Sequence, residues 1–200
     1  MIRHVVPDGV VAVEGTEEDS GRAGGGRTAS TLPDHRRREF AHGRACAAEA
    51  LAALGCPDVE VPVGSKGEPI WPPGVVGSLA HRRGYAAAAV APRSRLRGLG
   101  IDVEIDAALS PGAARRVCAP AELAAAEATG LAAASTVVFS AKESVYKAVY
   151  PLTRRRLTYG DVTVRLDPDV AAFEVDGALR ASGCFAIIGG RIFTAVPIGP

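Results

Sequence analysis

Three carboxylates and one lysine occupy two short segments whose spacing could bring them to a single site. Asp102 and Glu104 are two residues apart in the β-branched run of residues 98–105, which predicts a strand. Side chains two apart in a strand share a face, so both acids point the same way. Glu143 and Lys147 are four residues apart in a segment that reads as a helix, so we expect them to stack on one helix face.

This set of side chains fits a hard divalent cation held against a phosphate. Mg²⁺ takes carboxylate and phosphate oxygens in an octahedral array at about 2.1 Å, and Mn²⁺ also suits oxygen ligands. Each pair alone has a simpler interpretation. Asp102 and Glu104 could be the solvated face of a strand, and Glu143 with Lys147 could be a surface ion pair worth roughly 0.2–0.5 kcal/mol.

Taken together, the two segments resemble the 4′-phosphopantetheinyl transferases of the type that activates siderophore and surfactin synthetases. The pattern of that family is a G-[IV]-D-x-E strand followed by [FW]-S-x-K-E-[SA]-x-x-K, and both parts are intact at residues 100–104 and 139–147. Residues 36–44 are similar to the first basic helix of the family. Residues 66–72 and 77–81 are similar to its coenzyme A loop and strand. The resemblance spans residues 36–157.

The resemblance implies an enzyme that transfers 4′-phosphopantetheine from coenzyme A to a serine of an apo acyl or peptidyl carrier protein. The other product is adenosine 3′,5′-bisphosphate. Asp102, Glu104 and Glu143 would hold Mg²⁺ (or Mn²⁺), and Lys147 would place its ammonium on the pyrophosphate. Glu143 is the best candidate to accept the serine proton, directly or through a metal-bound water, and a water polarised by Glu104 is the alternative.

The resemblance also implies which residues bind coenzyme A. The expected contacts are Arg36, Arg44, Lys66, Gly67, Glu68, Pro69, Ala80, His81, Asp102, Glu143 and Lys147. Ala80 departs from the Ser or Thr that commonly precedes the family histidine. A hydrogen bond to phosphate worth about 1.5–3 kcal/mol at most would be lost there, unless Arg82, Arg83 or a water replaces it.

Several basic and aromatic residues keep two interpretations. Lys142 could contact phosphate or close its helix against the other half of the protein, and Trp71 could be core or ligand. The arginines at 93–97, 115–116 and 154–156 could dock an acidic carrier protein or could be solvated surface.

Helical and strand patterns predict an α+β protein. We expect helices at residues 35–54, 111–117, 120–128 and 135–149, the last one ended by Pro151. We expect strands at 74–81, 85–90, 98–105, 161–166, 171–175, 184–188 and 191–196, and a mobile glycine-rich loop at 15–33. This order suits two similar halves, residues 1–106 and 107–200. The resemblance implies a pseudo-twofold axis between them, with the site in the cleft where they meet.

Composition argues against other classes of protein. The net charge of +1 and the lack of interleaved aromatics disfavour nucleic-acid binding. The N-terminus lacks a signal-peptide core, and no apolar run approaches the ~20 residues of a membrane span. Four scattered cysteines fit reduced thiols. We therefore expect a cytoplasmic monomer. A non-catalytic module that binds coenzyme A or carrier proteins, and a metal-dependent phosphohydrolase, are the competing functions.

Overall fold

The computed structural model describes residues 1–16, 34–177 and 179–200, with only the backbone described for residues 34–36. The helices are α1 (Asp34–Ala53), α2 (Pro111–Val117), α3 (Pro120–Glu127) and α4 (Ala134–Thr153), with 3₁₀ turns η1 (Ile2–His4) and η4 (Tyr159–Asp161). The strands are β1 (Val11–Thr16), β2 (Val75–Arg82), β3 (Tyr85–Pro92), β4 (Gly98–Ile105), β5 (Val162–Asp167), β6 (Ala172–Gly177), β7 (Ala181–Ile188) and β8 (Arg191–Ile198).

The strands form two antiparallel sheets, so the α+β class is confirmed. One sheet has the order β1-β3-β2, and the other has the order β4-β8-β7-β6-β5. A two-residue turn, Arg83 (φ 42°) and Gly84 (φ 75°), joins β2 to β3 where the sequence predicts it. Positive φ at both positions matches the turn type that suits the twist of a hairpin.

Strand β1 was not predicted, although the apolar run before Glu14 is a signal for it. It pairs with β3 from Val11↔Val90 to Thr16↔Tyr85, so residues 15 and 16 belong to a strand and not to a loop. From residue 17 onward, the loop expected at 15–33 lies outside the described residues.

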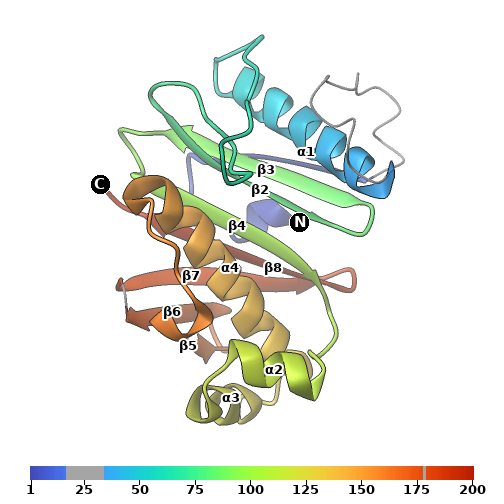
Figure 1. Ribbon diagram of the computed structural model, residues 1–200, viewed down its shortest axis with the longest axis vertical. Coiled ribbons are helices and arrows are strands. Elements are labelled where there is room, and N and C mark those ends of the chain that lie inside the picture. The colour runs from blue at the N-terminus through green and yellow to red at the C-terminus, as the bar shows by residue number, and fades with distance from the viewer. Residues whose placement is uncertain (17–33, 178) are drawn as a thin grey trace.

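The layers are α1, the small sheet, the large sheet and α4 (Figure 1). Side chains alternate along β3 and are buried on both faces. Ala86, Ala88 and Val90 pack in the core beneath α1. Ala87, Ala89 and Ala91 pack in a second core with Leu99, Ile101, Val103 and Phe193 of the large sheet. The opposite face of β4, which carries Asp102 and Glu104, is left to face α4.

Helix α4 lies unusually close to β4 because β4 carries glycine at two positions. A Cβ atom on Gly100 would lie 1.8 Å from the carbonyl oxygen of Ser144, and one on Gly98 would lie 2.6 Å from that of Ala148. The glycine of the Gly-Ile-Asp pattern therefore lets the helix backbone contact the strand. This contact brings the chemical groups of both elements within hydrogen-bonding distance.

The predicted end of α4 was wrong. The helix includes Pro151 and runs to Thr153, with Arg154 as its left-handed C-cap. A proline removes only one helical hydrogen bond, and the following turn still closes through the Arg154 N–H and the Tyr150 carbonyl at 2.8 Å. The other predicted helices and strands are present, with ends that shift by a few residues. All four cysteines are free.

Candidate active site

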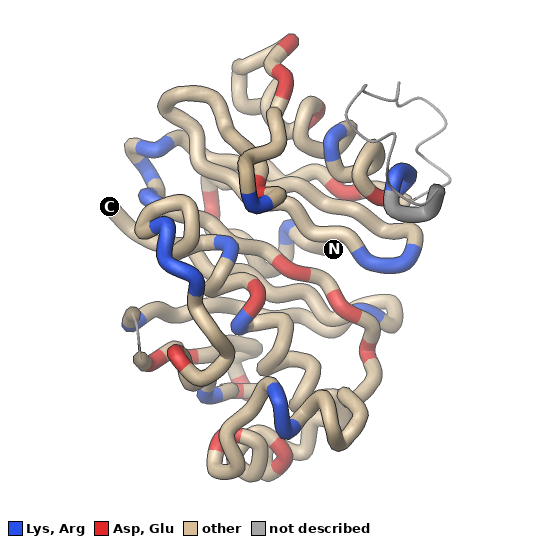
Figure 2. The backbone as a smooth tube through the Cα atoms, in the orientation of Figure 1, with Lys and Arg blue, Asp and Glu red and all other residues tan. Residues whose placement is uncertain are grey.

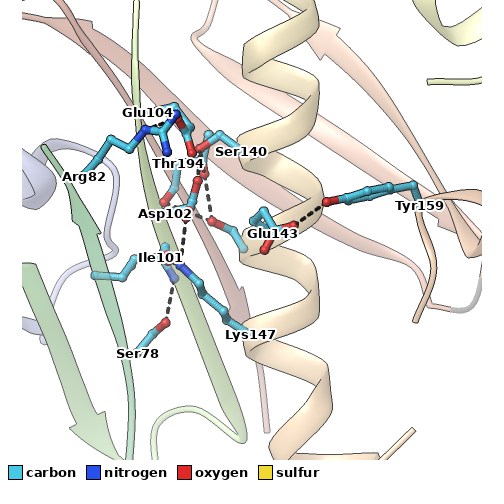
Figure 3. A network of polar contacts seen from close by, with 11 residues as sticks. Ser78, Arg82, Ile101, Asp102, Glu104, Ser140, Glu143, Lys147, Tyr159 and Thr194 are labelled. Atoms are coloured by element: carbon cyan, nitrogen blue, oxygen red, sulfur yellow. Dashed lines mark hydrogen bonds and ion pairs between the residues drawn. The ribbon is translucent and has the colours of Figure 1, made fainter. Parts of the chain in front are cut away.

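Asp102 joins β4 to α4 at the centre of the candidate site (Figure 3). The residue is only 7% exposed. Its Oδ1 accepts from Lys147 Nζ at 2.7 Å, and its Oδ2 accepts from Ser140 Oγ at 2.8 Å. Thr194 of β8 lies between Ser140 and Ser144, with hydroxyl distances of 2.9 and 2.7 Å. The carboxylate is therefore fixed in one orientation by groups from the neighbouring helix.

Lys147 is directed at the strand and not along its own helix. Besides its ion pair with Asp102, its ammonium donates to the carbonyl oxygen of Ile101 at 3.0 Å. Within the described part of the chain, the ion pair of Lys147 is with Asp102 and not with Glu143. The simpler interpretation of Glu143 and Lys147 as a surface ion pair is therefore wrong.

Glu104 lies on the same strand face, and its side chain is 12% exposed. Arg82, at the end of β2, places its Nε 2.9 Å from Glu104 Oε2. Burial, followed by the negative charge of Asp102, raises the pKa of Glu104, although Arg82 and Lys147 act in the opposite direction. The two strand carboxylates thus repel each other, and a cation shared by both would relieve that repulsion.

Glu143 is half-buried on α4 and borders a pocket of about 390 Å³. Its Oε1 accepts from the Tyr159 hydroxyl at 2.9 Å. Burial, followed by this contact with the glutamate, raises the pKa of Tyr159 to about 12. The residues that line the pocket are Lys142, Glu143, Tyr146, Arg156, Leu157, Thr158, Tyr159 and Val162. Glu143 therefore connects the centre around Asp102 to a space large enough for part of a ligand.

Whether these residues fit a metal ion depends on donor chemistry and on arrangement. Three carboxylates on facing elements, two of them in mutual repulsion, are a suitable donor set for Mg²⁺. In the part of the chain that the structure describes, however, no three candidate ligands lie close enough to share an ion. Asp102 and Glu104 hold Lys147 and Arg82, and Glu143 holds Tyr159. The donor set fits, and the shared metal site stays a prediction that requires Glu143 to leave Tyr159.

Lys142 has a structural role, which decides between its two interpretations. It is 3% exposed, and its ammonium donates to Glu122 Oε2 at 2.8 Å, the Val117 carbonyl at 2.9 Å and the Tyr159 carbonyl at 2.8 Å. Glu122 in turn accepts from the Val164 N–H at 2.6 Å. This buried pair ties α4 to α2, α3 and the turn that carries Tyr159.

Tyr159, Arg82, Ser140 and Glu122 were not predicted as site residues. Ser140 falls inside the Phe-Ser-x-Lys-Glu pattern and could have been singled out from it. Tyr159, Glu122 and Arg82 lie outside the two catalytic patterns, and their places depend on how distant segments pack.

Comparison with known proteins decides the family. A family model described as the 4′-phosphopantetheinyl transferase N-terminal domain matches residues 27–91, and one described as the 4′-phosphopantetheinyl transferase superfamily matches residues 98–185. The chain is 38% identical over 166 residues to the 4′-phosphopantetheinyl transferase PptT of Mycobacterium tuberculosis, covering 78% of this chain and 73% of that relative. The chain belongs to the 4′-phosphopantetheinyl transferase superfamily.

Other members of the superfamily match over smaller shares of their length. The 4′-phosphopantetheinyl transferase Npt of Nocardia iowensis is 42% identical over 151 residues, which is 75% of this chain and 65% of the relative. Enterobactin synthase component D of Salmonella typhi is 38% identical over 120 residues, which is 56% of this chain and 48% of that relative. The matched part of this chain thus spans between about half and three quarters of the relatives named here.

The superfamily resemblance places coenzyme A contacts on α1, where the structure describes Arg44 but not the side chain of Arg36. Arg44 donates to the carbonyl oxygen of Val61, and its guanidinium lies 4.9 Å from the centre of the Phe40 ring. Burial lowers the pKa of Arg44, but from a starting value so high that the group stays charged. Arg44 thus links the helix to the segment that leads into the loop of Lys66.

The loop of residues 66–69 is connected to the end of α4. Glu68 Oε2 accepts from the Lys66 N–H at 2.9 Å, and Glu68 Oε1 lies 2.8 Å from Arg154 Nη1. Gly67 has a φ of 87°, which only glycine adopts without strain. Pro69 forms a bridge with Val63 that closes the loop. The loop is therefore shaped by its own residues and lies beside the second half of the molecule.

The strand contacts expected next to this loop differ in accessibility. The His81 side chain is 42% exposed, with its Nδ1 3.6 Å from Glu39 Oε2. Ala80 is 1% exposed and packs in the core between the two sheets. Trp71 packs against the core beneath α1, which favours the core interpretation. The roles of His81 and Ala80 in binding coenzyme A stay predictions.

Proposed function

We propose that this protein transfers 4′-phosphopantetheine from coenzyme A to a serine of an apo acyl or peptidyl carrier protein. The observation that carries the proposal is the contact of Lys147 with Asp102 across α4 and β4, with Glu104 and Glu143 on either side. Membership of the superfamily, and the names of the relatives that match most of the chain, agree with it. Carriers of fatty-acid, polyketide, nonribosomal-peptide and siderophore synthesis are all chemically suitable partners.

In the reaction, the serine Oγ forms a bond to the pantetheine-linked phosphorus while the bond from that phosphorus to the bridging oxygen breaks. Adenosine 3′,5′-bisphosphate leaves with that oxygen. Glu143 accepts the serine proton, directly or through a water, with a water polarised by Glu104 as the alternative. Lys147 neutralises charge that develops on the leaving phosphate. Asp102, Glu104 and Glu143 would hold Mg²⁺ or Mn²⁺, which when bound clamps the pyrophosphate oxygens and withdraws charge from them.

Coenzyme A would lie with its nucleotide end at the first half and its pantetheine arm at the second. Arg36, Arg44, His81 and the loop of residues 66–69 would contact the nucleotide end. The pocket beside Glu143 would receive the arm, because Tyr146, Leu157 and Val162 offer apolar contacts and Thr158 offers a hydroxyl. Residues 1–106 and 107–200 would act as one unit in a cytoplasmic monomer, with a pseudo-twofold relation between halves that each pack a long helix on a sheet.

Alternative functions are separated by the fate of both substrates in one assay. Protein, Mg²⁺, coenzyme A and an apo carrier protein are mixed, and the carrier mass is measured with and without a chelator. The transferase predicts a carrier that gains one phosphopantetheine only when the metal is present. An unmodified carrier with intact coenzyme A indicates a binding module, and an unmodified carrier with cleaved coenzyme A indicates a phosphohydrolase.

Membrane attachment through a spanning helix finds no support in the structure. Throughout the described residues, no helix is both long and apolar enough to cross a bilayer.

A further inference from the structure

Arg82 is the cation closest to Glu104, and its side chain is free to move without the strand that carries it. The side chain is 46% exposed and contacts Glu104 through Nε alone. Its backbone is held independently, because Arg191 donates to the carbonyl oxygens of Arg82 and Arg83 at 3.0 and 3.1 Å. Arg191 also lies 5.2 Å from the centre of the buried Tyr85 ring. The turn is therefore anchored while the Arg82 guanidinium remains at the surface.

Charge at the site is balanced in this arrangement by side chains alone. The negative charges of Asp102 and Glu104 face the positive charges of Lys147 and Arg82 (Figure 3). A divalent cation bound by the two carboxylates would be repelled by both side-chain cations. One of those cations must move away for the ion to bind tightly.

Of the two, Arg82 is better suited to move. Lys147 is 28% exposed and is held by a second hydrogen bond to Ile101. Arg82 is more exposed, and the two terminal nitrogens of its guanidinium lie outside its bond to Glu104. A guanidinium binds phosphate oxygens through a planar pair of donors, which suits it to a pyrophosphate or a phosphate monoester.

We propose that Arg82 exchanges Glu104 for a phosphate group of coenzyme A when metal and substrate bind. This inference rests on the proposed function, and it adds a residue outside both catalytic patterns to the binding site. With neither metal nor coenzyme A present, Arg82 neutralises Glu104. With both present, its charge moves to the substrate and Glu104 becomes a metal ligand. Arg82 also follows Ala80 on the same strand, where the hydroxyl common in the superfamily is missing.

The exchange predicts opposite effects of one substitution on two ligands. Arg82→Gln removes a positive charge beside Glu104, so Mn²⁺ alone should bind about five-fold tighter. The same change removes a charge-assisted phosphate contact, so coenzyme A in the presence of Mn²⁺ should bind about ten-fold weaker. The increase in Mn²⁺ affinity that coenzyme A causes should therefore be smaller in the variant than in the wild type.

The test is a titration of the full chain with Mn²⁺, with and without coenzyme A, followed by electron paramagnetic resonance of free Mn²⁺. Isothermal titration calorimetry gives the affinity for coenzyme A. Arg83→Gln is the matched control, since Arg83 is in the same turn and its side chain takes part in no ion pair found among the described residues. Arg82→Lys keeps the charge without the planar donors and should restore the Mn²⁺ affinity more fully than the coenzyme A affinity.

Unchanged binding of both ligands in Arg82→Gln would overturn the exchange. Tighter Mn²⁺ binding with unchanged coenzyme A binding would overturn the transfer of Arg82 to phosphate. A wild-type protein that binds no Mn²⁺ in either condition would remove the proposed metal site itself, and this inference with it.

Discussion

At the scale of single residues, the candidate site is built from polar pairs that each hold one catalytic group in place. Ser140 and Lys147 fix Asp102, Arg82 occupies Glu104, and Tyr159 restrains Glu143. The carboxylates could be identified from the sequence because their spacing is local. Their partners come from elements distant in the sequence, so the arrangement of the pairs could not be predicted.

Tyr159→Phe should strengthen metal binding. The hydroxyl of Tyr159 holds Glu143 away from the other two carboxylates, and one such hydrogen bond contributes roughly 1 kcal/mol, or about a five-fold change in an equilibrium constant. We expect the Mn²⁺ dissociation constant to fall by about that factor. Tyr146→Phe, in the same pocket, is the control. A Tyr159→Phe protein that binds Mn²⁺ more weakly than the wild type would show that Tyr159 supports the site and does not restrain it.

Glu14 should make stability depend on pH in the acid range. Burial raises the pKa of Glu14, but contacts with the ammonium of Met1, the hydroxyl of Tyr85 and the N–H of Ile2 outweigh it and lower the pKa overall. A lowered pKa stabilises the fold above the ordinary carboxyl value of 4.5, and this contribution is lost as the pH falls through the lowered value. Solvent screening keeps the contribution to about 1 kcal/mol or less.

Urea denaturation of the wild type and of Glu14→Gln at pH 7, 5 and 3 measures this contribution. We expect the wild type to be more stable at pH 7 and the difference to shrink by pH 3. A difference that is constant across the range would assign the effect of Glu14 to packing instead of charge.

At the scale of elements, the patterns predicted β4 and α4 well but not what they contact. The glycines at 98 and 100 bring α4 against β4, and this explains why a glycine precedes Ile101-Asp102. Strand pairing is non-local, and nothing in the sequence of β4 shows that it pairs with β8. The boundary proposed at residue 106 follows β4 in the chain, whereas the sheets divide between β3 and β4.

The buried pair of Lys142 and Glu122 should be a main determinant of how α4 sits against α2 and α3. Lys142→Met leaves the carboxylate of Glu122 buried without its cation and should lower the free energy of unfolding by about 3–5 kcal/mol. Adding Glu122→Gln removes the unpaired charge and keeps an acceptor for the Val164 N–H, so the double variant should recover part of the loss. Chemical denaturation of the single and double variants measures both effects. A double variant no more stable than Lys142→Met would rule out the unpaired charge as the cause.

At the scale of the whole molecule, charge is distributed locally and the total stays near neutral. The segment that follows α4 is basic and lies beside the loop of Lys66 (Figure 2). Its arginines are not equivalent. Arg154 pairs with Glu68, Arg156 lines the pocket, and the side chain of Arg155 is 63% exposed with only a surface contact to Asp161. Arg155 is therefore the best single probe of a docking surface for an acidic carrier protein.

Arg155→Glu should raise the Michaelis constant for an acidic carrier protein about three- to ten-fold and leave that for coenzyme A unchanged. The effect should weaken at high salt, because exposed charges are screened. Arg165→Glu is the control, because Arg165 is similarly exposed but lies on β5 in a pair with Asp176. Equal effects of the two substitutions would indicate a general charge effect and remove the docking surface.

The central claim is that Asp102, Glu104 and Glu143 converge on one metal ion when coenzyme A is bound. A crystal structure of the protein with Mn²⁺ and coenzyme A, with anomalous diffraction data for manganese, tests it directly. We predict one anomalous peak within about 2.0–2.4 Å of an oxygen of each carboxylate, with Glu143 released from Tyr159 and a pyrophosphate oxygen on the metal. A peak elsewhere, or a bound coenzyme A with Glu143 still on Tyr159 and no metal between the three carboxylates, would contradict the claim.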